Sequence, residues 1–176
     1  MSKSRKKFIV MCGPPAAGKS TYIASLIRKH GEDEVRVISP DDFVYNDAGV
    51  YDWSPSRARG AWEQAYAALP EAVADEPTII VWDSTMTKAK GRRDILRRIN
   101  QADKKDKYVK VLALTPVCDV EELLRRNSAR SADRQVPDQT IAGMKASLEK
   151  NPPNYQEGWD DIVQLDSSGF DPRFNK

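Results

Sequence analysis

The stretch Phe8-Ile-Val-Met-Cys-Gly13-Pro-Pro-Ala-Ala-Gly18-Lys-Ser-Thr21 decides the fold of this chain. Its first five residues are apolar, and Gly13 to Thr21 match the pattern G-x-x-x-x-G-K-[ST] of a phosphate-binding loop. The motif requires a strand before the loop and a helix after it, and 21–30 has the composition of such a helix. The sequence therefore predicts a nucleoside triphosphate site in an α/β domain, rather than a glycine-rich turn without a ligand.

The loop residues have distinct expected roles. Backbone N–H groups of such a loop surround phosphate oxygens, helped by the positive end of the following helix. Lys19 would neutralise the β- and γ-phosphates, and the Ser20 hydroxyl would bind Mg²⁺. The predicted cofactors are therefore ATP and Mg²⁺. We expect the whole loop to form the nucleotide site, namely Gly13, Pro14, Pro15, Ala16, Ala17, Gly18, Lys19, Ser20 and Thr21.

Length and composition limit the classes of protein that the chain can belong to. Its 176 residues fit one domain, which we expect to span 1–176 with a basic tail at 1–6 and a loose tail at 167–176. A formal net charge of only +2 excludes a polycation that binds nucleic acid or membranes by bulk charge. A nucleic-acid partner would therefore have to be held locally.

Cysteine usage and the N-terminal segment bear on the cellular compartment. Cys12 and Cys118 are more typical of reduced core residues than of a disulfide or a metal pair. The five apolar residues that follow the basic N-terminus are too few for a signal peptide or a membrane span. We therefore expect a cytoplasmic protein without membrane contact, whose oligomeric state the sequence leaves open.

Apolar or β-branched runs alternate with longer segments of helical period, as is typical of a parallel sheet covered by helices on both faces. The runs are 8–12, 35–39, 78–82, 108–114 and 161–165. We therefore predict a three-layer α/β P-loop NTPase fold with a five-stranded parallel sheet. The expected helices are a core-packed one from Ser54-Pro55 to Val73, one at 89–101, one at 119–130 that opens near a capping box (Asp119-x-x-Glu122), and one from Pro137.

Three carboxylates follow predicted strands. Asp41 and Asp42 come after the second strand, and the carboxyl ends of parallel strands line the ligand crevice. Either could point into the site as a base, or could only cap the next segment. Asp83 follows the third strand at the position of a Walker B carboxylate, near the expected Mg²⁺. The next residue is Ser84 rather than a water-activating glutamate, which argues mildly for transfer to a hydroxyl.

Arginines in the second half of the chain could cover the phosphates. Arg126 and Arg130 are four residues apart and share one face of the helix at 119–130. A polar stretch with Arg134 follows, and the segment 119–137 has the composition of a lid. The alternative is a surface helix with scattered arginines.

These motifs together resemble the 5′-kinase domain of bacteriophage polynucleotide kinase. The matching blocks come in the same order and at similar spacing, and a looser similarity runs from Lys7 to Leu165. The blocks are Gly13 to Thr21, Ile38-Ser-Pro-Asp41-Asp42, Ile80-Val-Trp-Asp83-Ser-Thr85, and Leu124-Arg-Arg-Asn-Ser-Ala-Arg130 with Val136-Pro137 beyond it.

The resemblance implies an adenylate-kinase-like sheet and transfer of the γ-phosphate of ATP to a nucleic-acid hydroxyl. It implies that Asp41, rather than Asp42, is the general base, and that Asp83 helps near the acceptor and the metal. Arg126 and Arg130 would be lid arginines on the ATP phosphates, so the expected catalytic residues are Asp41, Lys19, Arg126 and Arg130.

The chain departs from the family at one position on the acceptor side. In the family an arginine three residues after the catalytic aspartate holds the acceptor phosphate, and Val44 stands there in this chain. Aromatic residues of the next segment could stack a base and its arginines could replace the missing contact, or the segment could pack on the core. Lys88, Arg92 and Arg93 could form a wall for a polynucleotide, or only an outer helix face. The acceptor candidates are thus Asp42, Tyr51, Trp53, Arg57, Arg59, Lys88 and Arg92.

Our leading functional prediction is an ATP- and Mg²⁺-dependent kinase for a hydroxyl of DNA or RNA, most simply the 5′ end, with a role in nucleic-acid modification or repair. A second interpretation keeps the chemistry but changes the acceptor to a modified base such as hydroxymethyluracil, a nucleoside or a small metabolite. A third is a nucleotide-binding switch that controls a protein partner.

Overall fold

Five short strands form one parallel sheet in the computed structural model, which describes residues 6–166. Their order across the sheet is β2-β3-β1-β4-β5, so the first strand lies in the middle. The predicted α/β fold with a five-stranded parallel sheet is confirmed, and each strand lies within two residues of its predicted bounds. The strands are β1 (Lys6–Cys12), β2 (Val35–Ile38), β3 (Ile79–Trp82), β4 (Tyr108–Leu114) and β5 (Asp161–Gln164).

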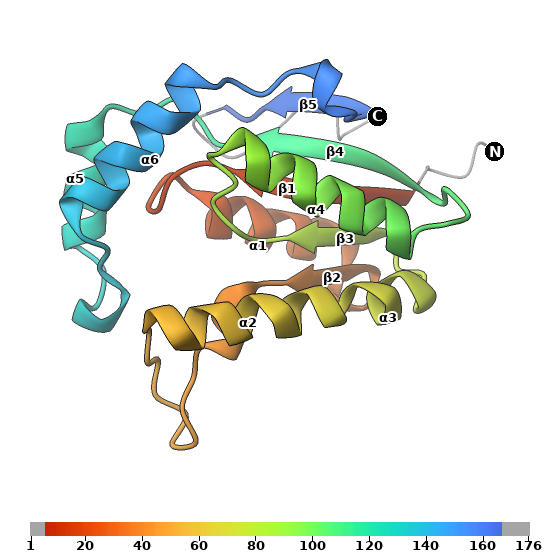
Figure 1. Ribbon diagram of the computed structural model, residues 1–176, viewed down its shortest axis with the longest axis horizontal. Helices are drawn as coiled ribbons and strands as arrows, with labels where there is room; N and C mark the ends of the chain where they lie inside the picture. Colours follow the sequence, from red (N-terminus) through yellow and green to blue (C-terminus); the bar gives the residue numbers. More distant parts are fainter. Residues whose placement is uncertain (1–5, 167–176) are drawn as a thin grey trace.

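Helices cover both faces of this sheet (Figure 1). Successive side chains of a strand point to opposite faces, so Phe8 and Val10 pack with one layer of helices, and Ile9 and Met11 with the other. The first layer holds α2, α3 and α4, and the second holds α1. The helices are α1 (Lys19–His30), α2 (Pro55–Ala67), α3 (Leu69–Ala74), α4 (Ala89–Ala102), α5 (Val120–Ser128) and α6 (Asp138–Lys150).

Two helix predictions need correction. The helix expected from Ser54 to Val73 is two helices that meet at Ala68, because Pro70 has no N–H for the helical ladder and its ring disfavours the preceding turn. At the start of α5, the side chain of Asp119 makes no capping hydrogen bond. Its expected capping-box partner, Glu122, accepts instead from Arg125 and Arg126.

The ends of the chain are only partly described. The predicted basic tail at 1–6 is one residue too long, because Lys6 begins β1 and its ammonium lies 3.1 Å from a carboxylate oxygen of Glu76. The rest of that tail and the tail at 167–176 lie outside the described residues. Within 6–166, none of the helices has the length and apolar character needed to cross a bilayer.

Candidate active site

The phosphate-binding loop leaves β1 at the carboxyl edge of the sheet and runs into α1. Gly13 is tightly enclosed, because a Cβ at this position would lie 1.9 Å from Thr115 Oγ1. Its N–H donates to Thr85 O over 2.8 Å, which ties the loop to the chain after β3. Gly18 has φ +100° and is the N-cap residue of α1. Only glycine combines the close approach at one end of the loop with the left-handed backbone at the other at little cost.

Lys19 points back over its own loop. Its ammonium donates to the carbonyls of Gly13, at 3.2 Å, and Pro14, at 2.9 Å. Burial lowers the pKa of Lys19 to about 8, and the nearby carboxylates of Asp83 and Asp41 oppose that shift. The charged form is therefore held weakly until an anion enters the loop.

Asp41 and Asp83 come to the same edge of the sheet because their strands are neighbours. Ile38 at the end of β2 pairs with Trp82 at the end of β3, and the N–H of Asp83 donates to Ile38 O over 2.9 Å. Asp41 lies in the short 3₁₀ turn that follows β2, Pro40–Phe43. Burial raises the pKa of Asp83, and the negative charge of Asp41 adds to the rise while Lys19 opposes it.

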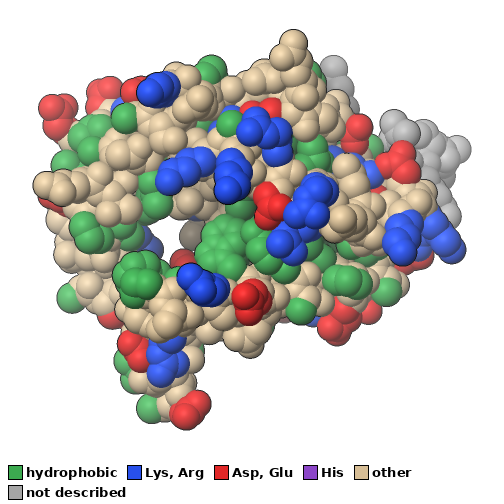
Figure 2. Space-filling model, in the orientation of Figure 1, with side chains coloured by type: hydrophobic (Ala, Val, Ile, Leu, Met, Phe, Trp, Pro, Cys, Tyr) green, Lys and Arg blue, Asp and Glu red, His purple; other side chains and the backbone are tan. Residues whose placement is uncertain are grey.

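One cleft of about 650 Å³ collects most of the predicted site residues. It lies among the phosphate-binding loop, the carboxyl ends of β2 and β3, and the segment 126–144. Figure 2 shows the molecule hollowed at this place, with an opening between the left-hand part of the view and the rest. The predicted residues that line it are Pro15, Ala16, Gly18, Lys19, Ser20, Thr21, Asp41, Tyr51, Trp53, Asp83, Arg126 and Arg130.

The predicted lid segment packs directly on the phosphate-binding loop. Ala17 of the loop, Leu123 of α5 and Ile141 of α6 form a small buried cluster. The side chain of Asn127 donates to Val136 O over 2.8 Å and accepts from the N–H of the same residue over 3.0 Å. These two bonds close the loop between α5 and α6, so that its arginines face the cleft.

The two lid arginines differ in their partners. Arg126 donates to a carboxylate oxygen of Glu122 over 2.7 Å, one turn earlier on α5. Arg130 has no ion pair within the described part of the chain, and its positive charge contributes to the lowered pKa of Lys19. Of these two arginines, Arg130 is the one that can bind a phosphate group without giving up a carboxylate.

The predicted acceptor residues separate into those in the cleft and those outside it. Tyr51 and Trp53 line the cleft, and Trp53 is 61% exposed. Asp42 does not line it, and Arg57 makes an ion pair with Asp52 at 3.0 Å. Arg59 lines a separate groove. Lys88 is an exposed residue just before α4 and lines neither the cleft nor that groove. Of the residues predicted for the acceptor side, the cleft therefore contains the two aromatic ones but none of the arginines.

The prediction of Arg92 as an exposed nucleic-acid contact is wrong. Its side chain is fully buried and forms an ion pair with Glu157 at 2.6 Å. It also donates to Asn151 O over 2.9 Å. Helical spacing explains the error, because Arg92 shares the inward face of α4 with Ile95 and Ile99. Arg92 therefore joins α4 to the segment before β5 and is out of reach of any substrate.

Sequence reasoning left Arg134 and Trp62 out of the candidate residues, although both line the cleft. The Arg134 guanidinium carbon lies 4.1 Å from the ring centroid of Tyr51, and the same side chain hydrogen-bonds to the hydroxyl of Tyr45. Arg134 thus bridges the lid to the loop after β2. The only signal in the sequence was its place in the polar lid stretch, whereas Trp62 has the spacing of an ordinary core residue of α2.

The loop fits the triphosphate of a nucleotide. Gly13 and Gly18 shape a backbone cradle, and α1 begins there with N–H groups that have no partner within the helix. Within the described residues, the Lys19 ammonium donates only to backbone carbonyls. Ser20 and Asp83, both lining the cleft, are the residues that could hold Mg²⁺. No group of three or more metal-ligating side chains occurs in residues 6–166, so nucleotide oxygens and water would have to complete the shell, as is usual for Mg²⁺ in kinases.

Comparison with known families identifies the domain. A family model described as an AAA domain matches residues 8–151, which is most of the chain. The chain belongs to this AAA domain family. No curated protein matches it.

Solved structures show that this AAA domain has the fold of P-loop kinases. A chain of the Pnkp1/Rnl/Hen1 RNA repair complex is 20% identical, with a TM-score of 0.67 over 85% of this chain and 46% of that one. A fungal RNA kinase is 16% identical, with a TM-score of 0.54 over 93% and 75%. Shikimate kinase from Acinetobacter baumannii, in complex with shikimate, is 17% identical, with a TM-score of 0.53 over 93% and 86%.

The AAA domain thus has the fold of P-loop kinases. It spans just under half the length of the RNA-repair chain that it matches. Its fold is shared by kinases of nucleic acid and of small metabolites, so the fold does not identify the acceptor.

Proposed function

We propose that this enzyme transfers the γ-phosphate of ATP to the 5′-hydroxyl of a nucleic acid. The observation that carries the proposal is the position of Asp41, which lines the same cleft as Lys19 and Arg130 but belongs to a different element, the turn that follows β2. A carboxylate that shares a cleft with a phosphate-binding loop can accept a proton from a hydroxyl bound beside the γ-phosphate.

The proposed roles follow from this arrangement. Asp41 accepts the proton of the acceptor hydroxyl while the acceptor oxygen bonds to the γ-phosphorus and the bond from that phosphorus to the bridging oxygen of ADP breaks. Lys19, Arg126 and Arg130 hold and neutralise the phosphoryl oxygens. Bound Mg²⁺, held through Ser20 and Asp83, would supply further charge neutralisation on the phosphates.

The acceptor side supports a nucleotide rather than a small apolar alcohol. Tyr51 and Trp53 offer rings in the cleft on which a base can stack. Val44 is buried and cannot contact a phosphate, but Arg134 lies in the cleft against Tyr51. We propose that Arg134 holds the first phosphate of the acceptor in place of the arginine that the chain lacks at position 44. The fold shared with a chain of an RNA repair complex and with an RNA kinase agrees with a nucleic-acid acceptor.

A panel of acceptors tests the proposal. Radiolabelled ATP is incubated with 5′-hydroxyl single-stranded DNA and RNA, duplex DNA with a hydroxymethylated base, nucleosides, and hydroxy acids such as shikimate. Label at the 5′ end of an oligonucleotide supports the proposal, and the variant Asp41→Asn in the same preparation controls for contaminating kinases. Label only on a small molecule or a modified base would refute it.

A second candidate is a kinase for a small hydroxyl compound. It is favoured by the buried Val44, which removes a phosphate contact beside Asp41, and by the fold that the domain shares with shikimate kinase. In the acceptor panel this candidate predicts labelling of nucleosides or hydroxy acids while every oligonucleotide stays unlabelled.

A further inference from the structure

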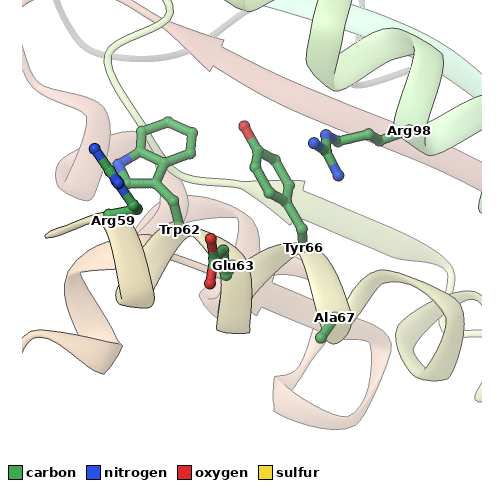
Figure 3. A pocket seen from close by; sticks show the side chains of 6 residues that line it. All are labelled: Arg59, Trp62, Glu63, Tyr66, Ala67 and Arg98. Carbon is green, nitrogen blue, oxygen red and sulfur yellow. The ribbon is translucent and has the colours of Figure 1, made fainter. Parts of the chain in front are cut away.

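A second groove lies outside the cleft, between α2 and α4. It has a volume of about 620 Å³ and is open to solvent. Figure 3 shows two aromatic rings, Trp62 and Tyr66, in a row between the side chains of Arg59 and Arg98. The spacing in the sequence produces this row, because Arg59, Trp62 and Tyr66 are separated by three and four residues and so share one face of α2. The lining residues are Arg59, Trp62, Glu63, Tyr66, Ala67 and Arg98.

The aromatic floor of the groove is anchored in the core. Tyr66 stacks on the fully buried ring of Trp82, with ring centroids 5.2 Å apart and planes 7° apart. Trp62 lies 5.9 Å from Trp82 and 5.7 Å from Tyr66. Both groove rings are only half-buried. Rings held this firmly lose little conformational freedom when a flat ligand stacks on them.

The positive charges at the two ends of the groove suit a polyanion that runs along it. Arg59 is exposed and has no ion pair within the described residues. The guanidinium carbon of Arg98 lies 3.9 Å from the ring centroid of Tyr66, and the same guanidinium pairs with Asp94 at 3.1 Å. Glu63 is the acidic residue of the lining and opposes an anion there. Arginines at both ends with rings between them are the arrangement on which single strands bind, with phosphates on the cations and bases on the rings.

Trp62 connects this groove to the proposed active site. It is the residue that lines both the groove and the cleft with Lys19 and Asp41. A chain molecule with its end in the cleft can therefore continue over Trp62 into the groove. A small metabolite has no such continuation.

We propose that the groove binds the single-stranded part of the acceptor a few nucleotides beyond its 5′ end. Phosphates contact Arg59 and Arg98, and a base stacks on Trp62. Tyr66, whose ring already contacts Trp82 and Arg98, holds the Arg98 guanidinium at the end of the groove. This inference rests on the proposed function, because it gives the groove to the same nucleic acid whose end enters the cleft. A duplex does not fit this role, since its bases present no free faces.

Binding measurements test the groove directly. Fluorescence anisotropy measures the Kd of 3′-labelled, 5′-hydroxyl single strands of about 12 and about 3 nucleotides over a range of salt concentrations. The double variant R59Q/R98Q is expected to bind the longer strand about 10- to 100-fold more weakly and the short one almost as well as the wild type. The slope of log Kd against log salt should fall by about 1.4, because two phosphate contacts are lost. E63Q should bind the longer strand more tightly.

Arg97 provides a matched control. It neighbours Arg98 on α4 and pairs with the same Asp94, at 2.5 Å, but it does not line the groove. R97Q therefore removes an equal charge from the same helix and should leave both Kd and the salt slope unchanged. The single variant R98Q is measured beside it. Equal losses of affinity in R97Q and R98Q would show that only the general charge of α4 matters, and would overturn the proposal.

The outcome separates this inference from the proposed function. If the wild type phosphorylates 5′ ends and R59Q/R98Q binds single strands with the same affinity as the wild type, the groove proposal alone is overturned. Absence of any phosphorylation of oligonucleotides together with absence of single-strand binding overturns both. Binding through the groove by a protein that phosphorylates only small molecules supports the groove and overturns the assigned reaction.

Discussion

Nucleotide affinity should depend on pH through Lys19. Burial lowers the pKa of this ammonium to about 8 in the free protein, and its hydrogen bonds to the described residues go only to the carbonyls of Gly13 and Pro14. A bound triphosphate brings negative charge to the same place and raises that pKa. The protonated form is therefore the one that binds.

The sign and size of the effect follow from this difference. Below about pH 8, Lys19 is charged in the free and the bound protein, so affinity is nearly constant. Above pH 8 the free protein must take up a proton to bind, and affinity falls by about tenfold for each pH unit until the pKa of the complex is reached. We expect the Kd for a nucleotide to rise about 16-fold between pH 8 and pH 9.5, because about half of the free protein has already lost the Lys19 proton at pH 8.

Binding of a non-hydrolysable ATP analogue, measured by titration calorimetry from about pH 7 to about pH 9.5, checks this prediction, with circular dichroism confirming that the protein stays folded. Lys19→Met is the matched variant, because it keeps the volume of the side chain but has no titrating group. It should bind more weakly at neutral pH and show no slope above pH 8. A flat profile in the wild type, or the same slope in both proteins, would refute the role assigned to Lys19.

Three further changes test the remaining parts of the site. Asp41→Asn should lower the rate of phosphoryl transfer by about 10²- to 10⁴-fold while nucleotide affinity stays nearly unchanged. The neighbouring Asp42 lies outside the cleft, so Asp42→Asn should have a small effect on initial rates, and equal losses in the two variants would contradict the assignment. Arg130→Ala should reduce the turnover number by up to about 10³- to 10⁵-fold, with Arg125→Ala, an exposed arginine of α5 outside the cleft, as its control. Normal turnover in Arg130→Ala would exclude a lid role. Arg92→Met should lower the free energy of unfolding by about 3–5 kcal/mol, because it leaves a buried carboxylate without its partner, and a urea titration with no change in midpoint would disprove this.

The phosphate-binding loop and the five strands could be predicted from the sequence because their signals are local. A run of apolar residues predicts a buried strand, and the spacing of Gly13, Gly18 and Lys19 describes one continuous turn of backbone. Parallel pairing then brings the chain after β2 and β3 to the same edge of the sheet, so the positions of Asp41 and Asp83 near the loop follow from the order of the strands.

Side chains that reach the site from distant segments could not be predicted in this way. Arg92 and Arg134 both belong to polar, arginine-bearing stretches, yet one is buried against Glu157 and the other lies on Tyr51. Their partners are 65 and 83 residues away in the sequence, and only packing decides which face of a helix or loop is turned inward. The break before α3 had a local cause in Pro70, whose effect outweighed the helical spacing around it.

The sequence by itself determined the phosphate-binding loop of this protein, because such a loop is built from consecutive residues and is shaped by its own backbone. Only the tertiary structure decided which side chains from distant segments line the cleft beside this loop. The cleft and the adjoining groove are assembled from β2, α2, α4 and the lid, and Trp62, which joins them, has a role that depends entirely on what packs around it.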